Sequence, residues 1–206
     1  MLSDYVIRIL RAKVYDIAIE TPLEKASGLS KRFKNTIFIK REDLQPVHSF
    51  KIRGAHNKIN QLSESEKENG IIAASAGNHA QGAALSAKTL GIKATIVMPK
   101  TTPPIKVKSV LSHGAKVELV GDTYDEAYEH AKELASQHGY TFIHPYDDKD
   151  VIAGQGTIGL EILKQHTGHI DAIFIPVGGG GLLAGVTAYI KTIRPEIKII
   201  AVEPDN

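Results

Sequence analysis

A lysine stands at the start of an expected helix, in the segment Ser49–Ala55 (SFKIRGA), for which Ser49 is the expected capping residue. The N-terminal end of a helix carries positive partial charge, so the pKa of Lys51 is expected to be lowered. A lowered pKa favours the neutral amine, which is the form that makes a Schiff base with an aldehyde. An ordinary solvent-exposed lysine explains the same residues, so Lys51 is a candidate that other segments must support.

A second candidate is the segment Ser75–Gly82 (SAGNHAQG), which follows a short apolar strand and opens a helix. Its small residues let the main chain approach a ligand closely, and first-turn N–H groups face an anion such as a carboxylate. Asn78 adds an amide donor at the same place. An ordinary strand-to-helix turn with an asparagine cap is the alternative interpretation.

Four consecutive glycines, Gly178–Gly181, form the most distinctive segment, VGGGGLLAG at 177–185. Glycines lose much backbone entropy on folding, and a simple tight turn needs only one or two of them. A run of four is suited to bring several main-chain N–H groups onto phosphate oxygens at a helix start. The segment therefore predicts a phosphate site.

The same glycines also fit a dinucleotide-binding fingerprint, G-x-G-x-x-A, at Gly179, Gly181 and Ala184. Glu203 ends the next strand about twenty residues later, where an acidic residue would bind a ribose. The alternative function is therefore a Rossmann-type nucleotide-binding module that uses Gly178–Gly185 and Glu203. This alternative leaves the other two candidate segments unexplained.

The elements that must position these segments are apolar strands that alternate with helices. Strands are expected at 36–40, 71–74, 94–98, 116–120, 141–144, 172–177 and 198–202. The principal helices are expected at 50–62, 78–90, 105–113, 122–139, 153–165 and 182–193. This alternation indicates an α/β fold with parallel sheets covered on both faces. We expect a small α/β lobe over 70–150 and a partial large lobe made of 1–69 and 151–206.

Composition restricts the other classes of function. A formal charge of +2, with 25 basic and 23 acidic residues mixed along the chain, gives no reason to expect nucleic acid or an acidic membrane as a partner. The absence of cysteine excludes disulfides and a cysteine nucleophile, and the nine histidines show no metal-ligand spacing, so no metal is expected. No secretory signal is recognised, and the cytoplasm is the expected location. The polar segment HPYDD at 144–148 could line a cleft, but it is interpreted as a loop with solvated acids.

Together, these segments resemble the fold-type-II enzymes that depend on pyridoxal phosphate (PLP), with a tryptophan synthase β-like fold. Within this group, the sequences of the motifs resemble the threonine dehydratase (threonine ammonia-lyase) family of the biosynthetic type. The resemblance runs from about Glu20 to the chain end and rests on several long motifs in order. They are KREDLQPVHSFKIRGA at 40–55, SAGNHAQG at 75–82, MPKTTP at 98–103, GDTYDEA at 121–127, AGQGTIGLE at 153–161 and VGGGGLLAG at 177–185.

The resemblance implies PLP as the cofactor, bound to Lys51 as a Schiff base. It implies that Phe50 packs beside the pyridine ring and that Asn78 hydrogen-bonds the ring hydroxyl. The implied phosphate-binding residues are Gly178, Gly179, Gly180, Gly181 and Leu182. The implied receptor of the substrate carboxylate is the turn formed by Ser75, Ala76, Gly77, Asn78 and His79.

The implied reaction is the elimination of water and ammonia from L-threonine to give 2-oxobutanoate, as in isoleucine biosynthesis, and L-serine would give pyruvate. Lys51 would also take the Cα proton of the substrate. The related serine racemases carry a second serine where this chain has Ala76. An alanine side chain cannot transfer a proton, so elimination without efficient racemisation is expected.

The resemblance also implies a catalytic domain longer than 206 residues, with the serine that contacts the pyridine nitrogen beyond Asn206. The last expected strand then leaves a sheet edge and apolar surface uncovered. We therefore expect little or no activity from this chain alone, and a homo-oligomer or a complementing chain as its partner. The remaining alternative is a non-catalytic truncated product that binds no cofactor.

Overall fold

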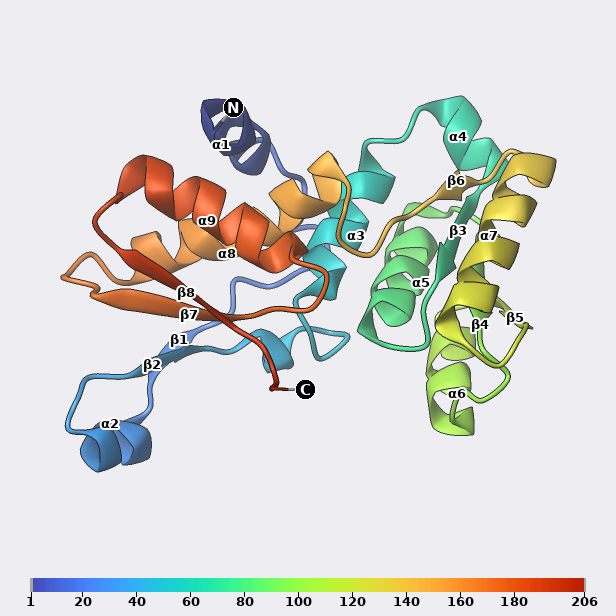
Figure 1. Ribbon diagram of the computed structural model, residues 1–206. Coiled ribbons are helices and arrows are strands. Elements are labelled where there is room, and N and C mark those ends of the chain that lie inside the picture. The colour runs from blue at the N-terminus through green and yellow to red at the C-terminus, as the bar shows by residue number, and fades with distance from the viewer. Residues whose placement is uncertain (1, 206) are drawn as a thin grey trace.

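The computed structural model describes residues 2–205, which form helices and strands in three separate sheets (Figure 1). The strands are β1 (Leu23–Lys25), β2 (Phe38–Lys40), β3 (Ile71–Ala74), β4 (Ala94–Met98), β5 (Lys116–Leu119), β6 (Thr141–Phe142), β7 (Ala172–Pro176) and β8 (Lys198–Val202). The helices are α1 (Leu2–Leu10), α2 (Ser27–Phe33), α3 (Lys51–Asn60), α4 (Glu64–Asn69), α5 (Asn78–Leu90), α6 (Pro104–Ser112), α7 (Tyr124–His138), α8 (Lys149–Gln165) and α9 (Gly181–Ile193), with a short 3-10 helix η1 (Glu42–Leu44).

The strands between residues 70 and 150 form one parallel sheet with the order β5-β4-β3-β6. All four residues of β3 are buried, because alternate side chains point to opposite faces and both faces are covered. Ile71 and Ala73 pack in the cluster that includes α5 and α6, whereas Ile72 and Ala74 pack with α7. Figure 1 shows α5 and α7 on opposite sides of β3. This sheet has the two covered faces that the sequence predicts.

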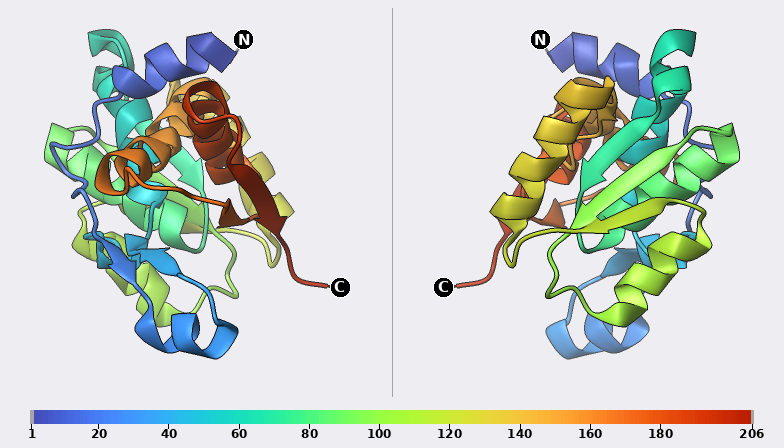
Figure 2. Two further views of the ribbon diagram at one scale, coloured as in Figure 1. Left: turned by 90° about the vertical axis from the view of Figure 1, so that its left-hand side faces the viewer. Right: turned by 90° about the vertical axis from the view of Figure 1, so that its right-hand side faces the viewer.

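The parallel pair β7–β8 is covered on one face, by α8 and α9. On the other face, the Phe174 side chain is 66% exposed and Val202 is 47% exposed. The prediction of two covered faces is therefore wrong for this pair within residues 2–205, and the expected uncovered apolar surface is present. Beyond β8, the last described residues extend away from the helices (Figure 2).

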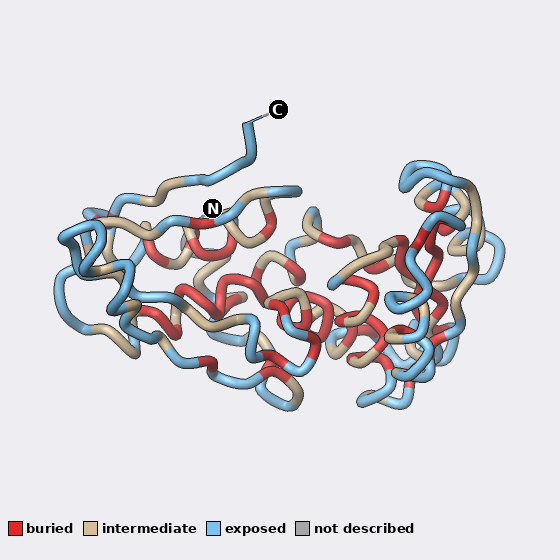
Figure 3. Tube along the Cα trace, turned by 90° about the horizontal axis from the view of Figure 1, so that it is seen from below, coloured by how far each residue is buried: buried red, intermediate tan, exposed pale blue. Residues whose placement is uncertain are grey.

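Helix α3 lies between these two parts of the chain and packs on both α5 and α8 (Figure 1). Ile52 and Ile59 are fully buried. Figure 3 shows buried residues along the middle of the molecule, with exposed residues toward both ends. The position of α3 matters for function because its first residue is Lys51.

Several elements differ from the sequence prediction. Strand β2 lies within the predicted strand 36–40, but its antiparallel partner β1 and the helices α2 and α4 were not predicted. Helix α8 begins at Lys149 and not at Ala153, because the Asp148 side chain accepts hydrogen bonds from the backbone N–H groups of Asp150 and Val151. Among the described residues, no helix has both the length and the apolar character that a membrane crossing requires.

Candidate functional site

The start of α3 differs from the predicted one. Ser49 does not cap the helix, because no side-chain cap hydrogen bond is present and Phe50, at the capping position, is itself helical, with φ −62° and ψ −16°. The Ser49 hydroxyl is instead buried without a hydrogen-bond partner among residues 2–205. The helix still begins at Lys51, as the first-turn position of the lysine required.

The Lys51 side chain is half-buried at this helix start. Its Nζ donates a hydrogen bond to the Pro145 carbonyl oxygen at 2.8 Å and lies 5.5 Å from the centroid of the Phe50 ring. Burial lowers the pKa of Lys51, because the charged form loses solvation. A lowered pKa was also expected from the sequence, because of the partial charge of the helix end, whereas the cause in the structure is burial. The neutral amine is therefore easier to form here than in an exposed lysine.

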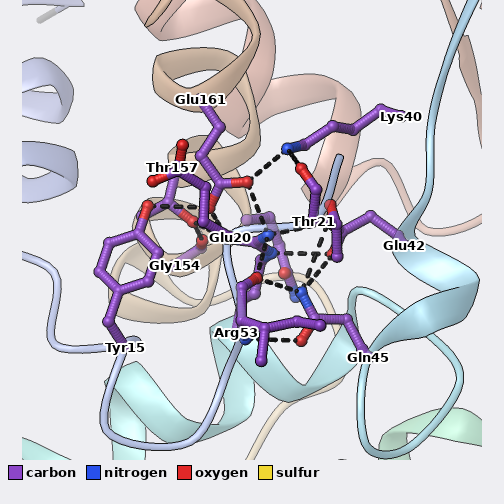
Figure 4. Close-up of polar contacts among 12 residues, drawn as sticks. Tyr15, Glu20, Thr21, Lys40, Glu42, Gln45, Arg53, Gly154, Thr157 and Glu161 are labelled. Atoms are coloured by element: carbon purple, nitrogen blue, oxygen red, sulfur yellow. Dashed lines mark hydrogen bonds and ion pairs between the residues drawn. The ribbon is translucent and has the colours of Figure 1, made fainter. Parts of the chain in front are cut away.

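The orientation of α3 is set by the fully buried guanidinium of Arg53 (Figure 4). Its Nε and Nη2 donate to the two carboxylate oxygens of Glu42, each at 2.8 Å. Its Nη1 and Nη2 donate to Glu161 of α8 at 2.5 and 3.0 Å, and further bonds reach Thr157 Oγ1 and the Ile19 carbonyl oxygen. The guanidinium charge is thus surrounded by acceptors, as a buried charge requires. This cluster ties α3 to α8 two residues after Lys51.

The four-glycine segment links β7 to α9. Gly180 has φ +83°, a left-handed conformation that favours glycine. The backbone N–H groups of Gly178 through Leu182 donate no hydrogen bond to any residue that the structure describes. Free N–H groups at the start of a 13-residue helix are suited to bind an anion.

One pocket of about 240 Å³ brings Lys51 and the glycine segment together. Its other lining residues are Phe50, Tyr146, Pro176, Val177 and Leu182. Lys51 carries the one charged side chain of this lining, and no acid is present. An amine with a lowered pKa beside free N–H donors fits a ligand with an aldehyde and a phosphate, so the residues present fit PLP.

The predicted turn Ser75–His79 follows β3 and includes the first two residues of α5, and it lies outside the lining of this pocket. Asn78 is the first residue of α5 and is exposed. The helix nevertheless lies against the start of α3, because a Cβ at Gly82 would be 3.2 Å from the main chain of Lys51 and Ile52. The structure therefore brings the turn near the same helix end but not into the pocket lining, and the roles of Ser75, Ala76, Gly77 and Asn78 stay predictions.

His79 is buried, and its Nε2 lies 2.8 Å from the carbonyl oxygen of Ile143. Because a carbonyl only accepts, Nε2 carries the proton and donates. Burial lowers the pKa of His79 to about 4, and the positive charge of Lys51 adds to the effect. The imidazole is therefore neutral near pH 7, and it ties α5 to the segment that contains Pro145.

Tyr146 was not singled out as a site residue from the sequence. The segment 144–148 was interpreted as a loop with solvated acids, but Tyr146 lines the pocket, in agreement with the alternative that the segment lines a cleft. Asp148 caps α8 and pairs with Lys58 at 2.9 Å, so the interpretation is wrong for this acid. The position of Tyr146 after a strand of a parallel sheet was the available signal, because ligands bind at the carboxyl ends of such strands.

A comparison with protein families identifies the family of the chain. The model of a family described as "Pyridoxal-phosphate dependent enzyme" matches residues 14–206. The chain belongs to this family. PLP-dependent enzymes of this kind carry the α/β fold-type-II architecture that the sequence predicted, and the structural matches confirm that fold.

Curated members of the family give the similarity in more detail. The chain is 59% identical over 201 residues to a biosynthetic, chloroplastic threonine dehydratase of Solanum lycopersicum, covering 98% of this chain and 33% of that protein. It is 55% identical over 206 residues to a biosynthetic L-threonine dehydratase of Burkholderia multivorans, covering 98% of this chain and 41% of that protein. The chain is thus a homologue of biosynthetic threonine dehydratases and spans less than half the length of these relatives.

Comparison with solved structures shows the same fold. The processed form of threonine deaminase isoform 2 from Solanum lycopersicum matches with a TM-score of 0.96 at 54% identity, covering 98% of this chain and 56% of that one. Maize serine racemase matches with a TM-score of 0.93 at 35% identity, covering 98% and 61%. The fold is therefore shared by PLP enzymes whose names state different reactions.

Proposed function

We propose that this chain is the PLP-binding part of a threonine ammonia-lyase, with Lys51 as the residue that holds the cofactor. The observation that carries the proposal is the pocket lined by both the half-buried Lys51 amine and the glycine segment with its free N–H groups. Membership of the PLP-dependent family supports the cofactor, and the identity to biosynthetic threonine dehydratases supports the reaction.

Each part of the pocket has a separate role in the proposed function. Gly178–Leu182 would bind the phosphate through main-chain N–H groups at the start of α9. Lys51 would bind the aldehyde carbon until the amine of the amino acid replaces it there. The released Lys51 amine, whose pKa is lowered by burial, would then accept the Cα proton. Phe50 would pack beside the pyridine ring and exclude water. Bound PLP supplies electron withdrawal from the substrate Cα.

We propose L-threonine as the substrate, with 2-oxobutanoate and ammonia as products, in isoleucine biosynthesis; L-serine would give pyruvate. The turn Ser75–His79 would receive the substrate carboxylate, and Asn78 would hydrogen-bond the ring hydroxyl. Ala76 has no group that can transfer a proton. This favours elimination over racemisation, although a serine racemase shares the fold.

We also propose that the chain has little or no turnover by itself and acts with a second copy or a complementing chain. The exposed apolar side chains of Phe174 and Val202 on the uncovered face of β7–β8 support a further covering element. Size-exclusion chromatography and a 2-oxobutanoate assay on the purified chain test this proposal, which full turnover by a monomer would overturn.

The two-lobe division, 70–150 against 1–69 with 151–206, remains a proposal that the separate four-stranded sheet supports. Limited proteolysis should cut first near residues 70 and 150. The cytoplasm remains the proposed location for this chain, to be tested by cell fractionation, since plant relatives are described as chloroplastic.

An absorbance titration tests the cofactor assignment. PLP added to the chain should give the near-visible band of lysine-bound PLP, and Lys51→Ala should lack this band. Lys88→Ala, which removes an exposed lysine of α5, is the matched control and should keep it. NAD binding that is equal with and without Lys51 would favour the Rossmann-type module, and a protein that stays colourless would favour the non-catalytic product.

A further inference from the structure

The dipeptide Pro145–Tyr146 contacts both parts of the candidate pocket. The Pro145 carbonyl oxygen accepts the hydrogen bond of Lys51 Nζ at 2.8 Å. The Tyr146 ring lies against Gly179, and a Cβ at Gly181 would come within 2.8 Å of the Tyr146 carbonyl oxygen. One short loop therefore touches the amine and the glycine segment together.

The contact with Tyr146 explains why position 179 is a glycine. The φ angle of Gly179 is not in the left-handed region, so the backbone there does not require glycine. A Cβ at Gly179 would lie within 3.0 Å of three carbons of the Tyr146 ring, closer than real Cβ atoms approach. At Gly178, by contrast, a Cβ would meet nothing within 4 Å. The side-chain space at position 179 is thus occupied by the tyrosine ring.

The Tyr146 ring also packs against a neighbouring aromatic side chain. The His144 ring packs edge-on against it, with centroids 4.7 Å apart and an interplanar angle of 84°. His144 packs in turn on Tyr128 of α7 and on Phe142 of β6, at 6.4 and 6.3 Å. The His144 Nδ1 accepts a hydrogen bond from the Asp147 N–H at 2.7 Å, which fixes the imidazole. A row of rings therefore connects α7 to the glycine segment.

We propose that Tyr146 is a positioning residue that holds the glycine segment in its phosphate-binding shape. The inference rests on the proposed function, because it takes Gly178–Leu182 as the phosphate site. Glycines have no side chains that could fix their own loop, so the ordering cost of binding is lower when a neighbour restrains the loop beforehand. The ring of Tyr146 provides that restraint through its carbon atoms, so a phenylalanine should replace it.

Affinity measurements on the 206-residue chain separate this role from general stability. Tyr146→Ala should weaken the binding of PLP, followed by absorbance, and of inorganic phosphate, followed by calorimetry, each by about tenfold. Tyr146→Phe should stay within about twofold of the unchanged chain. Pyridoxal, which lacks the phosphate, should react with Lys51 equally well in all three proteins. Tyr146→Leu, expected to weaken phosphate binding in the same direction, serves if the alanine variant does not fold.

A double-mutant cycle tests the contact itself. Gly179→Ala alone should weaken phosphate binding, because the new methyl group collides with the ring. In the Tyr146→Ala background the same change should cost little more, so the two losses should be clearly less than additive. Additive losses, or unchanged phosphate affinity in Tyr146→Ala, would overturn the inference while leaving the proposed function intact. Failure of the unchanged chain to bind PLP or phosphate would overturn both.

Discussion

Arg53 and Glu161 form a two-point ion pair in which both side chains are fully buried, with Nη1–Oε1 at 2.5 Å and Nη2–Oε2 at 3.0 Å. The pair joins α3 to α8 two residues after Lys51. Glu42 takes the other side of the guanidinium, and Lys40 lies 2.5 Å from Glu161. Two acids face two bases, so the cluster is neutral overall and each charge has a partner.

Replacement of Arg53 should therefore strongly destabilise the folded chain. Arg53→Met leaves the buried Glu161 carboxylate and the partly buried Glu42 carboxylate without their main partner. We expect a loss of about 3–5 kcal/mol in the free energy of unfolding, measured in urea. The control is Arg41→Met, because Arg41 also pairs with two acids, Glu24 and Asp43, but at the surface. This control should change stability little. Equal effects in the two variants would show that burial of the cluster is not what matters.

The packing of α9 on α8 should depend on Gly185. A Cβ there would lie within 3.0 Å of the Ile152 carbonyl oxygen and the Gly156 nitrogen, which are both main-chain atoms. Gly185→Ala should thus destabilise the chain by about 1–3 kcal/mol. Gly28→Ala in α2, where a Cβ meets nothing within 4 Å, should be neutral or stabilising by up to about 1 kcal/mol. Thermal unfolding of both variants tests this prediction. An unchanged stability in Gly185→Ala would contradict the close approach of α9 to α8.

His79 should contribute to acid sensitivity. Its pKa is about 4 in the folded chain, against an ordinary value of 6.5, so between these values the unfolded chain binds more protons. Stability should therefore fall as the pH is lowered from about 6.5 and level off below about 4. The contribution at pH 5 should be on the order of 2 kcal/mol. His79→Gln should flatten the slope of unfolding free energy between pH 7 and pH 5, and equal slopes would contradict the assignment.

Fully buried strands and capped helices were readable from the sequence. The apolar runs 71–74 and 94–98 are strands of the central sheet, and Thr123 caps α7 in a capping box with Glu126. Helix α4 was missed although Ser63 and Glu66 form the same kind of box. Strand β2 lies within the predicted strand 36–40, whereas its partner β1 was missed because its three residues are mostly exposed and show no apolar alternation.

The candidate site was readable in part. The sequence motifs indicated Lys51 and the glycine segment as site residues. Their spacing along the chain does not predict that they line one pocket. The place of Tyr146 after a strand suggested cleft lining, but its contact with Gly179 could not be predicted because only the fold creates it. The free Ser49 hydroxyl shows the same limit, since a favourable capping residue is unused when the next residue is already helical.

Covalent trapping tests the central claim most directly. The chain is incubated with PLP, reduced with borohydride, digested, and its modified peptide is identified by mass spectrometry. We predict one dominant modified residue, Lys51, with the label suppressed by excess inorganic phosphate that competes for the glycine segment. Labelling spread over exposed lysines, with Lys51 unmodified, would contradict the account.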